Sequence, residues 1–161
     1  MPKTPIRFTL NGAETGVFAN SGANLLDVLR REAGDLTPKQ GCAQGGCGAC
    51  SVMIDGELHL ACLTLAETAE GRRIDTVASL ETGARLHPLQ KAFAEGFAAQ
   101  CGFCSPGMIM AAKALLDTTP NPTREQVAEA ISGNLCRCTG YEPIINAILT
   151  AAAELRGRGA A

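Results

Sequence analysis

Eight cysteines constrain this chain more than any other feature, because they fall into two sets of four and none is left over. The first cysteine set reads C-x4-C-x2-C with a fourth cysteine further on, and consists of Cys42, Cys47, Cys50 and Cys62. The second cysteine set pairs C-x2-C with a later C-x-C, and consists of Cys101, Cys104, Cys136 and Cys138. Four thiolates that converge hold a metal centre, so the pattern predicts two such centres.

The spacing of the first set is that of a plant-type [2Fe–2S] centre. The loop at 41–50 holds four glycines, which lets the backbone turn tightly and lets amide N–H groups point at sulfur. Buried core cysteines or disulfides would not require this glycine density. A structural zinc site usually pairs two C-x-x-C knuckles, which this loop does not match. The first set therefore favours iron–sulfur.

The second set is less specific by spacing alone. Cys136 and Cys138 would point to one face of a strand and apart in a helix, and the Thr139-Gly140 that follows indicates a turn. From these residues alone, zinc and [2Fe–2S] both remain open for the second set.

Composition excludes several classes of partner. The 161 residues make one domain or two small ones, so metal centres would compensate for small hydrophobic cores. The net charge is −2, with no Trp and one Tyr, which gives no case for nucleic acid or an anionic membrane as a partner. The first residues lack the apolar run of a signal peptide, and no stretch is apolar enough to span a membrane. We expect a cytoplasmic protein without direct membrane insertion, in a compartment that keeps thiols reduced.

The N-terminal half has the pattern of strands around one helix. Alternating apolar residues at 6–10 predict a strand, Asn11-Gly12 a hairpin turn, and 17–18 the returning strand. A helix is expected over 25–32, capped by Asn24 or Ser21. Further strands are expected at 51–54, 57–60 and 73–77, which gives an α+β arrangement.

The C-terminal half has a helical period, beyond a boundary at 82–85. Leu89, Phe93 and Phe97 share one face of a first helix that begins near Pro88. Ser105 is the expected N-cap of a second helix. Two capping boxes, Thr123-x-x-Gln126 and Thr139-x-x-Glu142, predict the starts of a third and a fourth helix.

Three stretches resemble the small iron–sulfur subunit of molybdenum hydroxylases, the group of xanthine dehydrogenase, aldehyde oxidoreductase and carbon monoxide dehydrogenase. They are KQGCAQGGCGAC at 39–50, QCGFCSPGM at 100–108 and GNLCRCTGY at 133–141. The resemblance covers nearly the whole chain and implies that both cysteine sets hold [2Fe–2S] clusters. It also implies a β-grasp ferredoxin-like domain over 1–80, followed by a helical [2Fe–2S]-binding domain, a four-helix bundle, over 81–161.

The same resemblance implies a function. The chain would carry electrons between a molybdopterin active site in a large subunit, with the cofactor as its cytosine dinucleotide, and FAD in a medium subunit, either separate or fused. Gln100 would contact the pterin cofactor. No residue offers a catalytic base or nucleophile, because all the cysteines are assigned to the clusters. His59 and His87 are expected to be ordinary structural residues.

Two other classes of function compete with this one. A stand-alone two-cluster ferredoxin would shuttle electrons by diffusion, although such carriers are often more acidic than −2. The second competing class is a cluster-based sensor or a zinc-stapled interaction module. A DNA-binding sensor would need a basic recognition helix, and the sequence shows none. Iron, zinc, molybdenum and flavin contents would distinguish these classes.

Overall fold

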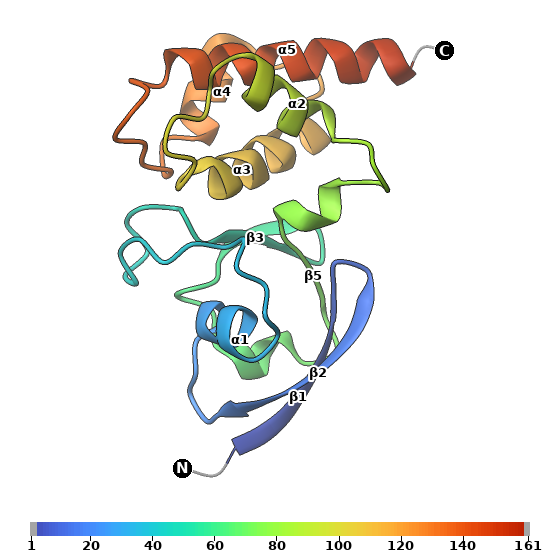
Figure 1. The fold of residues 1–161 in the computed structure, drawn as a ribbon, viewed down its shortest axis with the longest axis vertical. Helices are drawn as coiled ribbons and strands as arrows, with labels where there is room; N and C mark the ends of the chain where they lie inside the picture. The colour runs from blue at the N-terminus through green and yellow to red at the C-terminus, as the bar shows by residue number, and fades with distance from the viewer. Residues whose placement is uncertain (1–2, 160–161) are drawn as a thin grey trace.

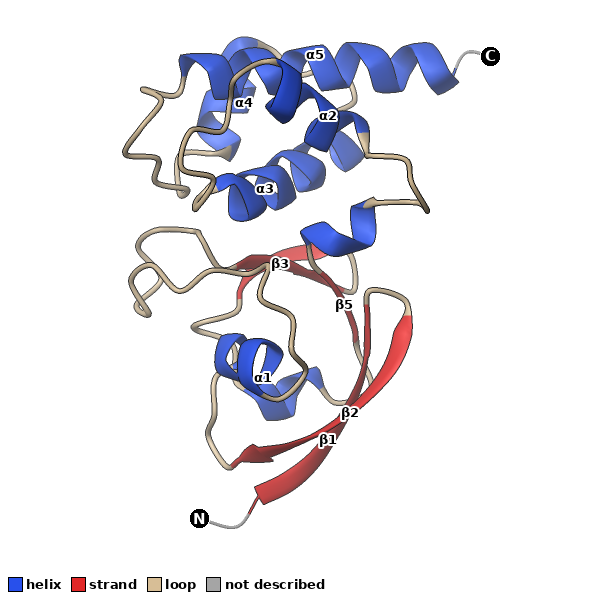
Figure 2. Cartoon of the chain, in the orientation of Figure 1, coloured by secondary structure: helices blue, strands red, loops and turns tan. Residues whose placement is uncertain are grey.

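The computed structural model describes residues 3–159 and their side chains as far as 157. In the described residues, a twisted sheet with one short α-helix forms one half, and the other four α-helices form the second half (Figures 1 and 2). The α+β prediction is confirmed. Among the described residues, no helix has the length and apolar character needed to cross a membrane.

The first two strands form the predicted hairpin. β1 (Lys3–Leu10) pairs antiparallel with β2 (Ala13–Asn20), and the pairing of Leu10 with Ala13 leaves Asn11 and Gly12 as a two-residue turn. Alternate residues of β1 are buried in the first hydrophobic core, which follows from the period-two pattern of the sequence.

Helix α1 (Leu25–Arg31) packs against the sheet through its apolar residues. Asn24 is the cap: its side-chain oxygen accepts a hydrogen bond from the Asp27 N–H at 2.8 Å, and Ser21 is not needed. The predicted helix end is correct to one residue, since Glu32 is the C-cap.

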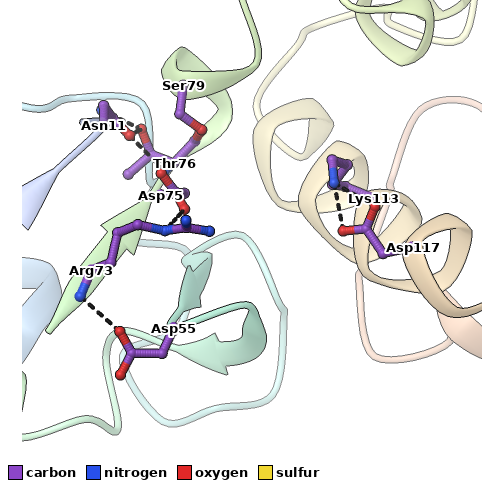
Figure 3. Close-up of polar contacts among 8 residues, drawn as sticks. All are labelled: Asn11, Asp55, Arg73, Asp75, Thr76, Ser79, Lys113 and Asp117. Atoms are coloured by element: carbon purple, nitrogen blue, oxygen red, sulfur yellow. Dashed lines mark hydrogen bonds and ion pairs between the residues drawn. The ribbon is translucent and has the colours of Figure 1, made fainter.

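Strand β5 (Arg73–Asp75) joins the two hairpins of the sheet. β3 (Ser51–Ile54) and β4 (Glu57–Leu60) form the second hairpin, and the strand order is β2-β1-β5-β3-β4, with β5 parallel to β1 and antiparallel to β3. The predicted strand at 73–77 is two residues too long. It stops because Thr76, held by Asn11 (Figure 3), caps a 3₁₀ helix, η2 (Val77–Leu80). A second 3₁₀ helix, η1 (Ala66–Ala69), precedes β5.

The helical half consists of α2 (Pro88–Glu95), α3 (Ser105–Thr118), α4 (Arg124–Ala130) and α5 (Glu142–Gly159). All four contribute to one hydrophobic core that is separate from the core of the sheet. The capping box of Thr123 and Gln126 is confirmed, with both reciprocal hydrogen bonds present.

Three local predictions in the helical half are wrong. Phe97 is not on the buried face, because α2 ends at Glu95, and its side chain is 82% exposed. Ser105 is not the N-cap of α3; Cys104 occupies that position without a side-chain cap. Thr139 does not cap α5, which begins three residues later. Its hydroxyl instead contacts the Cys136 sulfur at 3.1 Å and accepts from the Tyr141 N–H at 3.2 Å.

The two halves meet where α3 lies over β3 and over the loop that precedes it (Figure 1). Gly107 makes the closest approach: a Cβ built there would lie 2.3 Å from the Gly48 carbonyl oxygen and 3.1 Å from the Ala49 Cα. Only glycine fits at this point, so backbone from α3 rests directly on the loop of the first cysteine set.

Beside this contact is an open, polar cleft of about 280 Å³. Arg73 and Asp75 line one wall of the cleft and form an ion pair at 2.9 Å. Lys113 and Asp117, one turn apart on α3, line the other wall and form a second ion pair (Figure 3). Each charge is therefore neutralised within its own half of the chain.

Candidate iron–sulfur centres

The first cysteine set is assembled from one loop and one strand end. Cys42, Cys47 and Cys50 lie on the loop between α1 and β3, and Cys62 lies just after β4. Because β3 and β4 are hydrogen-bonded neighbours, the hairpin brings Cys62 back beside Cys50. The two thiols interact directly, as do those of Cys42 and Cys47.

The loop supplies hydrogen-bond donors to sulfur, as its glycine content predicts. The Cys42 sulfur accepts from the Gly46 N–H at 3.2 Å and from the Gln44 N–H at 3.5 Å. Gly41 must lack a side chain, because a Cβ there would lie 2.7 Å from the Cys47 sulfur. The Gln44 N–H, followed by the hydrogen bond with the Cys47 thiol and the Gly46 N–H, lowers the pKa of the Cys42 thiol to about 7, which favours the thiolate that binds metal.

Cys50 has the opposite environment within the same set. Burial raises the pKa of its thiol to about 11, and the adjacent Cys62 and Cys47 add to the effect. The Cys42 and Cys47 edge of the first set is therefore partly exposed and rich in hydrogen-bond donors, and the other edge is buried in the core of the sheet. A metal centre that deprotonated Cys50 would be enclosed by protein on that side.

The second cysteine set is assembled from two connections between helices. Cys101 and Cys104 lie between α2 and α3, and Cys136 and Cys138 lie between α4 and α5. The thiols again interact in two pairs, Cys104 with Cys136 and Cys138 with Cys101. Cys104 and Cys136 are partly buried, whereas Cys101 and Cys138 are exposed.

The pKa values of the second set follow its geometry. Burial raises the pKa of Cys104 to about 12, with its neighbours Cys136 and Cys101 adding to the effect. Burial opposes ionisation of Cys136 too, but hydrogen bonds from the Thr139 hydroxyl and from nearby backbone N–H groups outweigh it, and the pKa is lowered. The hydrogen bond with Cys101 raises the pKa of Cys138.

The thiols of each set are arranged in two pairs. Within residues 3–159, no three side chains of His, Cys, Asp or Glu converge closely enough to hold a single metal ion. Each set instead presents two pairs of thiols, and a [2Fe–2S] cluster has two irons that each take two protein ligands. The residues therefore fit a two-iron cluster at each set.

Sequence reasoning missed two residues that support the second set. The hydroxyl of Tyr141 accepts a hydrogen bond from the Cys136 N–H at 3.0 Å, and Asn134 is buried beside Gly48. The signal for Tyr141 was its place in the last of the three motifs, as the only tyrosine of the chain. Gln100 is exposed next to Cys101.

The two histidines have structural surroundings. His87 caps α2, where its Nδ1 accepts from the Leu89 N–H at 3.2 Å and Gln90 reciprocates. His59 on β4 has its Nε2 3.8 Å from the Glu57 carboxylate.

Comparisons with known proteins assign both halves. A family of 2Fe-2S iron-sulfur cluster binding domains matches residues 17–94, and a family of [2Fe-2S] binding domains matches residues 76–149. The chain is thus of the 2Fe–2S binding class, with two matching family domains.

Relatives identify the family more narrowly. The nicotine 6-hydroxylase small subunit of Paenarthrobacter nicotinovorans is 45% identical, over 95% of this chain and 92% of that subunit. The nicotinate dehydrogenase small FeS subunit of Eubacterium barkeri is 43% identical, over 92% and 94%. Quinoline 2-oxidoreductase from Pseudomonas putida 86 has a chain that superposes with a TM-score of 0.94 at 45% identity, covering 99% of both chains.

One further relative is much longer. The aldehyde oxidoreductase of Megalodesulfovibrio gigas is 47% identical over 93% of this chain, which spans only 17% of that protein's length. The chain belongs to the family of small 2Fe–2S iron–sulfur subunits of the molybdenum hydroxylases. Members of this family are either separate subunits or part of a longer oxidoreductase chain.

Proposed function

We propose that this chain is the electron-transfer subunit of a molybdenum-containing hydroxylase or dehydrogenase complex, and that it holds two [2Fe–2S] clusters. The observation that carries the proposal is the arrangement of all eight cysteines into two groups of four, each made of two contacting pairs. When bound, each cluster takes up and releases single electrons. The protein itself performs no bond chemistry, and substrate conversion belongs to the large subunit.

The ligand assignment follows the thiol pairs. In the first set, Cys42 and Cys47 would hold one iron and Cys50 and Cys62 the other. In the second set, the pairs would be Cys104 with Cys136 and Cys101 with Cys138. We assign the first set to a ferredoxin-like β-grasp domain over 1–80 and the second to a four-helix bundle over 81–161.

The two clusters would face different partners. From the family resemblance we propose that the second cluster lies towards molybdopterin cytosine dinucleotide in a large subunit, with Gln100 against the pterin. We propose that the first cluster lies towards FAD in a medium subunit. Exposure supports the first of these contacts. Cys101 and Cys138 reach the surface, and Phe97, Phe103 and Leu135 lie exposed within four residues of a cysteine of this set. Apolar side chains around an exposed thiol pair are typical of a docking surface.

The names of the relatives suggest the substrate class. These names refer to nicotine, nicotinate, quinoline and aldehyde, so we propose an N-heteroaromatic compound or an aldehyde as the substrate of the complex. Such a complex would work in the cytoplasm.

Anaerobic purification of this chain by a tag from its native host, followed by metal and flavin analysis, tests the proposal. We expect about four irons per chain, with molybdenum and flavin co-eluting. Four irons without molybdenum or flavin would indicate a free ferredoxin instead. Zinc in place of iron would overturn electron transfer altogether.

A further inference from the structure

Asn134 is a buried polar residue that lies between the two cysteine sets. Its side chain is 4% exposed, and its amide nitrogen donates to the Gly48 carbonyl oxygen at 2.9 Å and to the Ser51 hydroxyl at 3.4 Å. The Ser51 hydroxyl donates to the same carbonyl at 2.8 Å. A buried amide that lost these partners would carry a desolvation penalty, so the three groups hold one another in place.

The next residue, Leu135, links the two cysteine sets through the backbone. Within residues 3–159, its hydrogen bond is the only one between backbone groups of the two cysteine-bearing segments. The Leu135 N–H donates to the Cys47 carbonyl oxygen at 2.9 Å. Leu135 is followed by Cys136 in the chain. Cys47 of the first set and Cys136 of the second are therefore joined by covalent bonds and a single hydrogen bond.

The Leu135 side chain cannot hold this hydrogen bond in place, because it is 58% exposed. Asn134 can, because it is fixed on both sides. Its own N–H donates to the Ile131 carbonyl oxygen at 2.9 Å, at the end of α4. Its side chain donates to the Gly48 carbonyl oxygen on the loop of the first cysteine set. Asn134 thus fixes the distance and angle between the Leu135 N–H and the Cys47 carbonyl.

We propose that Asn134 is a positioning residue for electron transfer between the two clusters, an inference that rests on the function proposed above. Electron tunnelling through bonds is faster than across a gap, so the Cys47–Leu135 hydrogen bond is the direct link between the two sites. By holding the first loop on the segment that leads into Cys136, Asn134 keeps that link short. Its role is to set electronic coupling and not to bind iron.

Asn134→Ala in the assembled complex tests this role, with Asn121→Ala as the matched control on an exposed loop. Three quantities are measured: iron content, spin–spin coupling between the two reduced clusters by electron paramagnetic resonance, and the rate of electron equilibration after rapid one-electron reduction. We expect about four irons per chain in both variants. In Asn134→Ala the coupling should weaken and equilibration should slow by roughly tenfold, as for a positioned group that shifts by a fraction of an ångström.

Hydrogen exchange gives a readout that does not depend on turnover. The peptide containing the Leu135 amide should lose protection in Asn134→Ala and keep it in Asn121→Ala. Unchanged coupling, rate and protection, together with a lower melting temperature, would show that Asn134 only stabilises the fold and would overturn the inference.

Ser51→Ala provides a milder variant if Asn134→Ala fails to assemble. It removes the 3.4 Å contact with Asn134 and the hydrogen bond from Ser51 to the Gly48 carbonyl, and it keeps the hydrogen bond from Asn134 to Gly48. A smaller decrease of coupling in the same direction supports the inference, and no change overturns it. Wild-type protein without two clusters would overturn the proposed function as well, whereas two clusters with coupling indifferent to Asn134 would overturn the inference alone.

Discussion

The two cysteine sets are built in different ways. The first is a glycine-rich loop that rests on a sheet, with one strand end closing it. The second has no sheet and joins two connections between helices, more than thirty residues apart in the chain. Four thiols can thus be gathered either by one locally folded loop or by the packing of helices. The first set should therefore tolerate loss of its metal better than the second.

Replacing one cysteine of each set gives the largest expected effect. Cys50→Ser and Cys104→Ser should each lose one cluster, leaving about two irons per chain. Because the proposed second centre would link the α2–α3 connection to the α4–α5 connection, Cys104→Ser should lower the melting temperature more than Cys50→Ser.

Iron analysis and calorimetry of the purified chain would check this. Cys50→Ala and Cys104→Ala serve as controls for residual ligation by the serine hydroxyl. An equal loss of melting temperature from both sets would contradict the distinction between them.

Gly107→Ala tests the contact that joins the two regions. The new methyl group would meet the Gly48 carbonyl, so we expect a loss of about 1–3 kcal/mol in the free energy of unfolding. Gly157→Ala is the matched control, because no heavy atom lies within 4 Å of its added Cβ and alanine favours a helix. Denaturant unfolding measures both. A neutral Gly107→Ala would mean that the two halves can separate at no cost.

Tyr141→Phe affects the second set alone. It leaves the Cys136 N–H without its acceptor, at a cost of about 1 kcal/mol in stability. We also expect a shift in the reduction potential of the second cluster and none in the first, because hydrogen bonds near the ligands tune potential. A redox titration followed by electron paramagnetic resonance would resolve the two clusters. Equal shifts in both would refute the assignment of Tyr141 to one set.

Removal of the Asp55 charge should have the smallest effect. Asp55 lies in the sheet half of the chain, between β3 and β4. The Arg73 N–H, which donates to Asp55 (Figure 3), and the Arg72 guanidinium hold the pKa of this carboxyl below its ordinary value of 3.8. Its ionised form therefore stabilises the fold above pH 3.8, and this contribution is lost as pH falls through the folded-state pKa.

Asp55→Asn should flatten the acid limb of the stability curve slightly and leave stability at pH 7 a little lower. Thermal melts between pH 3 and pH 7 would measure it. An acid limb identical to that of the wild type would contradict the role of Asp55.

The sequence predicted features that depend on neighbouring residues or on the spacing of cysteines. The hairpin at Asn11-Gly12, the cap at Asn24 and the box at Thr123 depend on residues close in the chain, and all three are present. Phe97 was placed wrongly because the apolar period continues past the end of α2. Thr139 was placed wrongly because the Cys136 sulfur and the Tyr141 N–H both compete for its hydroxyl.

Contacts between the halves were out of reach of sequence reasoning. Asn134 reads as an ordinary turn residue, and its partner Gly48 is 86 positions away. The metal ligands themselves could be proposed from spacing, but their division into pairs required the folded chain.

The position of β5 has a consequence for the order of events during synthesis. This three-residue strand is the only described strand that pairs with both hairpins of the sheet. Until residues 73–75 leave the ribosome, β1–β2 and β3–β4 are two separate hairpins, each marginal in water. The loop of the first cysteine set then has no completed sheet beneath it. We therefore expect the proposed cluster of the first set to be inserted only after residues 73–75, which follow the last cysteine of that set by more than ten positions.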